Sequence, residues 1–242
     1  MRLPVLCCAL LIALLAAPAN ADDTIKSVGI ISAIGDTMTK QHVGLMVFGN
    51  TDEKEAIDSW QVDEFVISEI SAALAGQYEI KPVSYAKTDF IAHQKGIVVD
   101  SDFDGEASIK HVAPEPGKEP DAYIIVTKAF SDDYIGQTNQ HLFGVGLYEH
   151  RDRNQAIYVS YEVNVVDGHT LKYMTDRYPH GFLDFGVTGD YDRMVYREAS
   201  GLWADGFVMT PEQKLRAQET LKSALREGIA KALKDFGFKP GG

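Results

Sequence analysis

Three aspartates at alternate positions could bind a metal ion. Asp100, Asp102 and Asp104 are followed by Gly105, as at the start of a calcium-binding loop. Calcium prefers several oxygen ligands, and alternate aspartates bring three carboxylates to one side of a tight turn. The twelfth position of such a loop is His111, where a bidentate glutamate is expected. The pattern leaves two interpretations open, a weak calcium site and a solvated acidic turn.

A second candidate is an apolar segment within the glycine- and aromatic-rich loop 178–186. Phe182, Leu183 and Phe185 stand there among residues that are typical of loops. If these side chains are exposed, the patch indicates a site for a protein partner. If they are buried, they fill a gap between the sheet and the helices. Both interpretations stay open at this point.

Hydrolytic chemistry is a third possibility, because histidines and carboxylates are abundant. The seven histidines show no H-E-x-x-H spacing, and the chain has no G-x-S-x-G motif. A pair of acids could hydrolyse glycosides, but the sequence selects no pair. The acids in predicted loops and helix starts are Asp132, Asp133, Asp184, Asp190 and Asp192. No catalytic residue is predicted, although a hydrolase with scattered Asp and His residues remains an alternative, since active sites converge in space rather than in sequence.

The first 21 residues have the pattern of a secretory signal peptide. Arg2 gives a positive start, residues 6–17 form an uncharged apolar run, and Ala19-Asn20-Ala21 matches an A-x-A cleavage site. The apolar run is shorter than the roughly 20 residues that span a bilayer. We therefore expect cleavage after Ala21 and no membrane anchor in the mature chain.

Cysteine usage agrees with export. Cys7 and Cys8 both lie within the expected signal peptide, so the mature chain would have no disulfide and no thiol nucleophile. They stand near the start of the apolar run rather than after it, which disfavours lipidation. The sequence has no N-x-S/T sequon, and with the signal this favours a bacterial periplasmic protein.

The chain has 242 residues and a formal net charge of -12. Removing residues 1–21 makes the mature chain more acidic by one charge. This balance argues against a nucleic-acid-binding protein, which needs a basic surface, and disfavours docking to an anionic membrane by charge. The length after cleavage fits a single domain over residues 22–242, with a core at 25–178 and helices at 190–236.

Alternating or continuous apolar residues predict strands along most of the core. The expected strands are 25–34, 43–48, 78–85, 122–126, 142–149, 156–167 and 171–178. The first two are predicted to form a hairpin around Gly35-Asp36, and residues 50–58 are read as a polar connection. The 122–126 run is typical of a strand that is buried on both faces.

Helical periodicity predicts four helices. The expected helices are 59–74, a short one at 86–94, 190–204, and a long C-terminal helix of about 25 residues that begins after Thr210. Thr210, Pro211 and Gln213 form a capping-box pattern, and Gly237 is the expected stop. The fold class is therefore α/β, with one mixed sheet, an antiparallel meander and helices packed on the sheet.

Three segments resemble a module of bacterial envelope proteins. They are 121–126 (Asp-Ala-Tyr-Ile-Ile-Val), 145–148 (Val-Gly-Leu-Tyr) and 161–170, which ends in an Asp-Gly turn. The pattern is similar to the group that contains the amino-terminal domain of TolB, the curli secretion lipoprotein CsgG and the peptidoglycan-synthase activator LpoB. The strand–helix–strand unit at 28–83 completes the likeness. The resemblance implies a non-catalytic interaction module, without the pore or propeller functions of those families.

These observations favour an exported, periplasmic, non-enzymatic accessory protein that binds another envelope component. The alternatives are a periplasmic hydrolase and a weak calcium- or small-ligand-binding protein. We expect no cofactor, apart from calcium at Asp100, Asp102 and Asp104 under the third interpretation.

Overall fold

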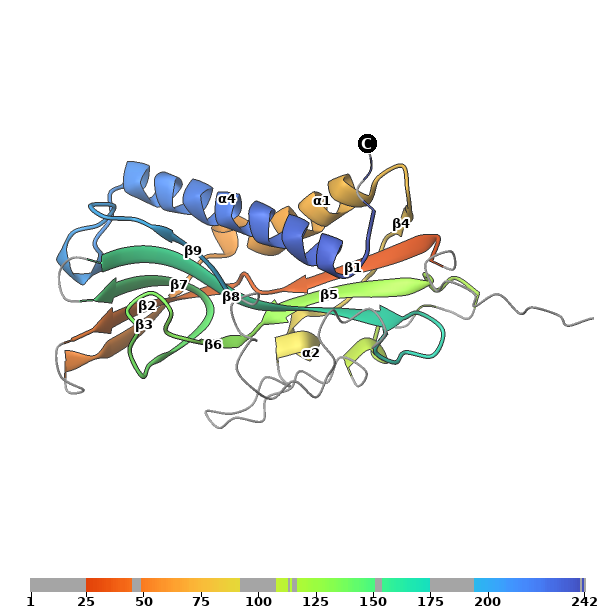
Figure 1. Cartoon of the computed structure of the whole chain (residues 1–242), viewed down its shortest axis with the longest axis horizontal. Coiled ribbons are helices and arrows are strands. Elements are labelled where there is room, and N and C mark those ends of the chain that lie inside the picture. The colour runs from red at the N-terminus through yellow and green to blue at the C-terminus, as the bar shows by residue number, and fades with distance from the viewer. Residues whose placement is uncertain are drawn as a thin grey trace, which may run out of the picture.

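The computed structural model describes residues 25–44, 49–91, 108–112, 114, 117–150, 154–174, 194–239 and 241. Its described part is an α/β fold with one mixed sheet, helices packed on the sheet and a long C-terminal helix (Figure 1). The predicted fold class is confirmed at this level.

The sheet combines parallel and antiparallel pairs. Its main path runs in the order β3-β2-β7-β8-β5-β1-β4, while β6 pairs with β7 and β9 pairs with β8. β1 pairs in parallel with β4 and β5, and β2 pairs in parallel with β7. The strands are β1 (Ser27–Ala33), β2 (Thr37–Val43), β3 (Thr51–Ala56), β4 (Glu79–Lys81), β5 (Ala122–Lys128), β6 (Phe130–Asp132), β7 (His141–His150), β8 (Asn154–Asp167) and β9 (Met194–Glu198).

The long strand β8 connects the two halves of the sheet. Residues 154–160 of β8 pair with β7, and residues 161–167 pair with β5. β1 and β2 are separated by only three residues, yet they join different neighbours on the two halves. The chain therefore changes partners at residues 34–36, and this junction lies between the two halves.

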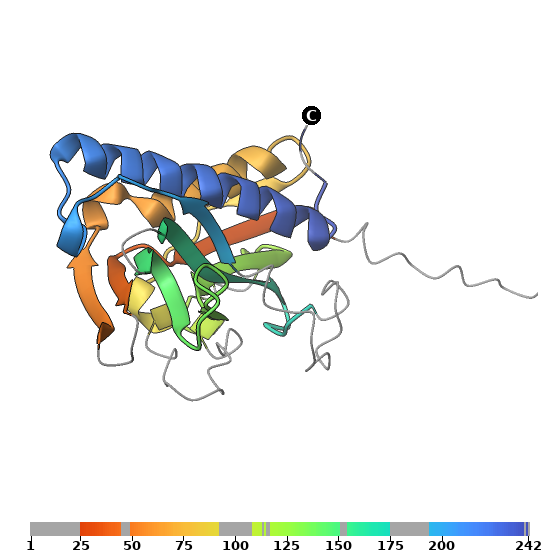
Figure 2. The same cartoon turned by 60° about the vertical axis from the view of Figure 1, so that its left-hand side comes forward.

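Two helices cover one face of the sheet. α1 (Val62–Leu74) packs on β1, α4 (Pro211–Asp235) packs on β8 and β9, and the two helices pack on each other. Both views show α1 and α4 together on this side (Figures 1 and 2). α2 (Lys87–Ile91) lies on the opposite face against β1 and β5. Two short 3-10 helices, η3 (Asp58–Trp60) and η6 (Asp205–Phe207), precede α1 and α4.

Burial on both faces explains the composition of β1 and β5. All seven residues of each strand are buried, because α1 and α4 cover one side while α2 and residues near Ile109 cover the other. Alternate residues accordingly enter two cores: Ile124 and Val126 face α1 and α4, whereas Tyr123 and Ile125 face α2. The predicted doubly buried strand at 122–126 is confirmed.

The capping box of α4 is also confirmed. The Thr210 hydroxyl accepts a hydrogen bond from the Gln213 amide, and the Gln213 side chain accepts one from the Thr210 amide. Both bonds satisfy amides that a helix start otherwise leaves without partners. Beyond the last turn, Gly237 has a φ of 74° and ends the helix.

Two of the predicted elements are wrong. Residues 194–198 form the strand β9 rather than part of a helix at 190–204, because they pair antiparallel with β8. Residues 50–58 contain the edge strand β3 rather than only a polar connection. No apolar alternation reveals β3, because five of its six residues are exposed and four of the six are charged.

The predicted N-terminal hairpin is wrong as well. The strand that follows β1 is 37–43, and it pairs with β3 and β7 instead of β1. Residues 45–48 of the predicted strand 43–48 lie outside the described residues. In the predicted strand 171–178, residues 171–174 make an isolated bridge between Val166 and Tyr173, and the remainder lies outside the described residues.

The expected signal peptide lies outside the described residues. None of the helices within the described ranges combines the length and the apolar character that crossing a membrane requires.

Candidate functional site

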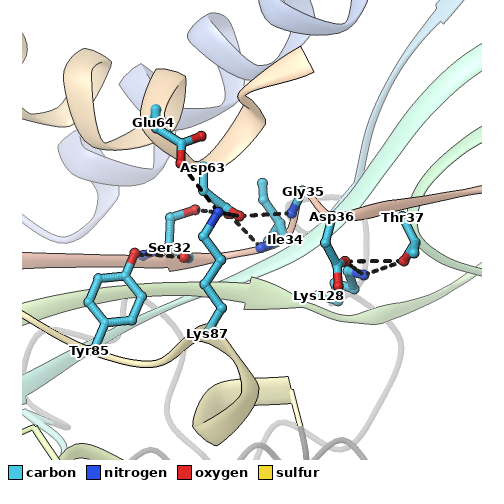
Figure 3. A network of polar contacts seen from close by, with 10 residues as sticks. All are labelled: Ser32, Ile34, Gly35, Asp36, Thr37, Asp63, Glu64, Tyr85, Lys87 and Lys128. Carbon is cyan, nitrogen blue, oxygen red and sulfur yellow. Dashed lines mark hydrogen bonds and ion pairs between the residues drawn. The ribbon is translucent and has the colours of Figure 1, made fainter. Parts of the chain in front are cut away.

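A buried carboxylate lies at the junction between β1 and β2. Asp63, in the first turn of α1, is only 1% exposed. It accepts hydrogen bonds from the Ser32 hydroxyl at 2.7 Å and from the backbone amides of Ile34 at 2.7 Å and Gly35 at 3.3 Å. The Nζ of Lys87 lies 2.9 Å from its second oxygen (Figure 3). These five residues form what we call the Asp63 network.

The Asp63 network joins three elements. Tyr85 donates a hydrogen bond to the Ser32 carbonyl at 2.8 Å and accepts one from the Ser32 amide at 3.0 Å, which fixes the segment before α2 against β1. Burial raises the pKa of the Tyr85 hydroxyl. Burial acts to lower the pKa of Lys87, but Asp63 outweighs it and leaves that pKa raised. The ion pair and hydrogen bonds of the Asp63 network, together with those of Tyr85, therefore connect β1, α1 and α2.

A second ion pair lies just across the same junction. The Nζ of Lys128, at the end of β5, is 2.6 Å from Oδ1 of Asp36 and 2.9 Å from the Thr37 hydroxyl (Figure 3). Burial acts to raise the pKa of Asp36, but the hydrogen bond and charge of Lys128 outweigh it and lower that pKa. Lys128 is only 7% exposed, so its charge is compensated inside the protein.

The Asp36–Lys128 pair lines a hollow of about 160 Å³. Its wall is built from the start of β2, from β3, from the end of β5 and from β7 (Asp36, Thr37, Thr39, Lys54, Lys128, Phe143 and Val145). Its described lining thus includes two lysines, two threonines, one aspartate and two apolar side chains.

A wider hollow of about 640 Å³ lies along the connection between β6 and β7. Asp133, which is 2% exposed, accepts hydrogen bonds there from the amides of Ile135 and Gly136 and from the hydroxyls of Thr138 and Tyr148. Burial raises the pKa of the Tyr148 hydroxyl, and the hydrogen bond to Asp133 raises this pKa further. Asp133 therefore holds the loop in place.

Beside Asp133, Oδ1 of Asp132 lies 3.2 Å from Nδ1 of His141. This acid–histidine pair is more than half exposed at the edge of the wider hollow. A carboxylate that orients an imidazole in this way is one part of a general-base arrangement. The remaining parts, a nucleophile and a group to stabilise an oxyanion, are not assigned.

Another histidine lies between two acids near the start of β5. His169 has Nδ1 3.3 Å from Glu119 and Nε2 3.6 Å from Asp121. Asp121 also accepts hydrogen bonds from the amides of Lys26 and Ser27. No group of three or more possible metal ligands is found within the described ranges.

Most of the site residues predicted from the sequence lie outside the described residues. Asp100, Asp102 and Asp104, the proposed calcium ligands, fall outside the described residues, as do Phe182, Leu183 and Phe185. The acids Asp184, Asp190 and Asp192 fall outside them too. Of the predicted acids, the structure places Asp132 and Asp133 at the wider hollow.

Sequence reasoning missed Asp63, Lys87 and Lys128. Asp63 had a signal, because it precedes Val66, Ile67 and Ile70 at helical spacing and so lies on the apolar side of α1. Lys128 also had one, since it directly follows a continuous apolar strand. The partners of both residues come from other elements, which no local pattern identifies.

Comparison with known proteins identifies no relative of this chain. The chain matches no protein-family model, no curated protein and no solved structure.

Proposed function

We propose that this chain is an exported, non-enzymatic interaction module of the bacterial envelope, which binds an extended segment of another envelope protein at β3. The observation that carries the proposal is the exposed edge of the sheet. β3 stands at the end of the strand order, and five of its six residues are exposed. Its outer edge has no strand partner within the described ranges.

An exposed strand edge offers backbone donors and acceptors to a further strand. On β3, Glu55 already pairs with Lys40 at 2.6 Å and with Lys214 at 3.0 Å. Asp52 and Glu53 are exposed and have no ion pair within the part of the chain that the structure describes. A segment that carries lysine or arginine would complement these two acids, so we expect a basic, extended partner.

Export is tested by the amino terminus of the mature protein. Full-length chain expressed in a Gram-negative bacterium should appear in the periplasmic fraction with Asp22 as its first residue, measured by intact-mass spectrometry. Replacing Ala19 and Ala21 with larger residues should leave the precursor uncleaved. A full-length chain retained in the cytoplasm would overturn the assignment to the envelope.

Strand addition is tested with proline. Neighbouring residues of an antiparallel strand direct their amides to opposite edges, so of Asp52 and Glu53 one amide faces β2 and the other faces outward. Asp52→Pro and Glu53→Pro should therefore differ in stability, and the more stable variant identifies the outward amide. That variant should lose photo-crosslinking of envelope proteins from a probe at Thr51. Undiminished crosslinking would contradict binding at this edge.

The hydrolase alternative rests on one observation, the pair formed by Asp132 and His141 at the wider hollow. If the pair acts as a general base, an ester, phosphate or glycoside screen should detect turnover that His141→Ala abolishes. Activity of this kind would replace the proposal of a non-enzymatic module.

A further inference from the structure

The smaller hollow, beside the junction of β1 and β2, has the composition of an anion site. We propose that it binds a small oxyanion or carboxylate between Lys54 and Lys128. This inference is independent of strand addition at β3, because it concerns side chains on the sheet rather than its backbone edge. Its volume of about 160 Å³ is well above the roughly 10–15 Å³ that one water molecule requires.

Lys128 is positioned for this role by the fold. Its stem passes over Gly144, which has a φ of 61°, and a Cβ at that position would lie 3.0 Å from the Lys128 Cδ. A side chain at position 144 would therefore crowd the lysine and strain the backbone. Gly144 leaves room for a long cation that is only 7% exposed, at the end of a strand whose seven residues are all buried.

The opposite wall supplies further donors. Lys54, on β3, lines the hollow and is exposed, and Thr39 lines it from β2. Neither side chain has a hydrogen-bond or ion-pair partner within the described chain. Ammonium and hydroxyl groups are the donors that carboxylates and phosphates accept from.

Asp36 provides an internal counter-ion that a ligand could replace. Its side chain is 38% exposed, and it shares the Lys128 ammonium with Thr37. Among the residues that the structure describes, the charged side chains that line the hollow are Asp36, Lys54 and Lys128, and these three sum to a net positive charge in a chain whose formal charge is -12. An arriving anion would thus meet two lysines and one carboxylate among these side chains, and it would compete with Asp36 for the Lys128 ammonium.

Titration calorimetry at low ionic strength tests the site, with phosphate, sulfate and acetate as the probes. We expect saturable binding of at least one of the three. Asp36→Asn removes the competing charge and should tighten binding by about tenfold, while Lys54→Gln should weaken it by a similar factor, on the scale of one charge–charge contact near the surface. The probe that binds best distinguishes a carboxylate ligand from a phosphate- or sulfate-like ligand.

The matched control is Lys40→Gln. Lys40 lies on the neighbouring strand but pairs with Glu55, so binding should be unchanged. Lys128→Met retains an apolar stem of similar length, and its folding is checked by circular dichroism before titration. The proposal is overturned if the wild type binds none of the three probes. It is also overturned if binding persists unchanged when Lys54→Gln is combined with Lys128→Met.

Discussion

Asp63 accepts hydrogen bonds from three groups and pairs with Lys87, so replacing Asp63 should destabilise the protein. Asp63→Ala leaves the Ser32 hydroxyl and two backbone amides without their acceptor, and it leaves Lys87 without its main counter-ion. Leaving a buried donor without its acceptor costs about 1–3 kcal/mol, whereas Lys87 is 40% exposed and can be solvated once the pair is broken. We expect a loss of this size in the free energy of unfolding, measured by urea denaturation.

Glu64 is the matched control for Asp63. It is the next residue of the same helical turn, pairs with the same lysine at 3.4 Å, and is 60% exposed. Glu64→Ala should cost no more than about 1 kcal/mol, as exposed ion pairs do. Equal effects of the two substitutions would contradict the structural role given to Asp63.

The Asp36–Lys128 pair should contribute to stability only above acidic pH. The pKa of Asp36 in the folded protein lies below its ordinary value of 3.8. The unfolded chain therefore binds this proton more readily, and the contribution is present above that value and lost as the pH falls through the folded pKa. The stability difference between wild type and Asp36→Asn should shrink between about pH 5 and pH 2, the range in which a lowered Asp titrates. A difference that is constant over this range in urea titrations would contradict the pair's effect.

At this scale, sequence reasoning finds types of residue but not their partners. Asp132 and Asp133 were selected as acids in a loop, yet only the fold shows that one is saturated by hydrogen bonds and the other pairs with His141. Asp63 reads locally as an acid that favours a helix start. Its donors come from β1 and the two residues that follow it, and from Lys87 at the start of α2, about 30 and 24 residues away along the chain.

Among the elements, α4 depends on its first turn. Thr210→Ala removes the hydroxyl that caps the Gln213 amide, and loss of such a cap costs about 1 kcal/mol. Thr220→Ala, within the same helix, is the control, since its hydroxyl donates only to the Arg216 carbonyl one turn earlier. Thermal unfolding should show a lower Tm for Thr210→Ala than for Thr220→Ala. The reverse order would contradict the importance of the cap.

α4 approaches the sheet most closely at Gly228. A Cβ there would lie 2.3 Å from the Tyr161 hydroxyl oxygen and 2.8 Å from Val195 Cγ1. Gly228→Ala should therefore destabilise the protein by about 1–3 kcal/mol through overpacking, although alanine favours the helix by about 1 kcal/mol. In a Tyr161→Phe background the penalty should decrease, which chemical denaturation of the four variants measures. Stabilisation by Gly228→Ala would show that α4 does not need this close contact.

The elements also show which sequence signals are sufficient. α4 was predicted closely, because its capping box, apolar face and terminal glycine all agree. β9 was predicted as a helix, since Met194, Val195 and Ala199 fit a helical stripe when the pairing with β8 is unknown. β3 was missed because four of its six residues are charged, as is common for a strand at the edge of a sheet.

At the scale of the whole molecule, the strand β8 belongs to both halves of the sheet, since it pairs with β7 in one half and with β5 in the other. The two tryptophans report on different places: Trp60 precedes α1, and Trp203 follows β9, yet both belong to the same hydrophobic core. We therefore expect one cooperative transition. Fluorescence of Trp60→Phe and of Trp203→Phe should give the same urea midpoint as far-ultraviolet circular dichroism of the same variant. Midpoints that differ between probes would show that the halves unfold separately.

The pairing of β1 also governs when the fold can close during synthesis. Ser27, at the start of β1, is bound to Asp121, which follows 94 residues later, and β5 is the main neighbour of β1. As the chain leaves the ribosome from its amino terminus, β1 must wait for almost half of the polypeptide before this neighbour is made. Such distant closure is slow. The half of the sheet that contains β1 can therefore be completed only after β5 has left the ribosome.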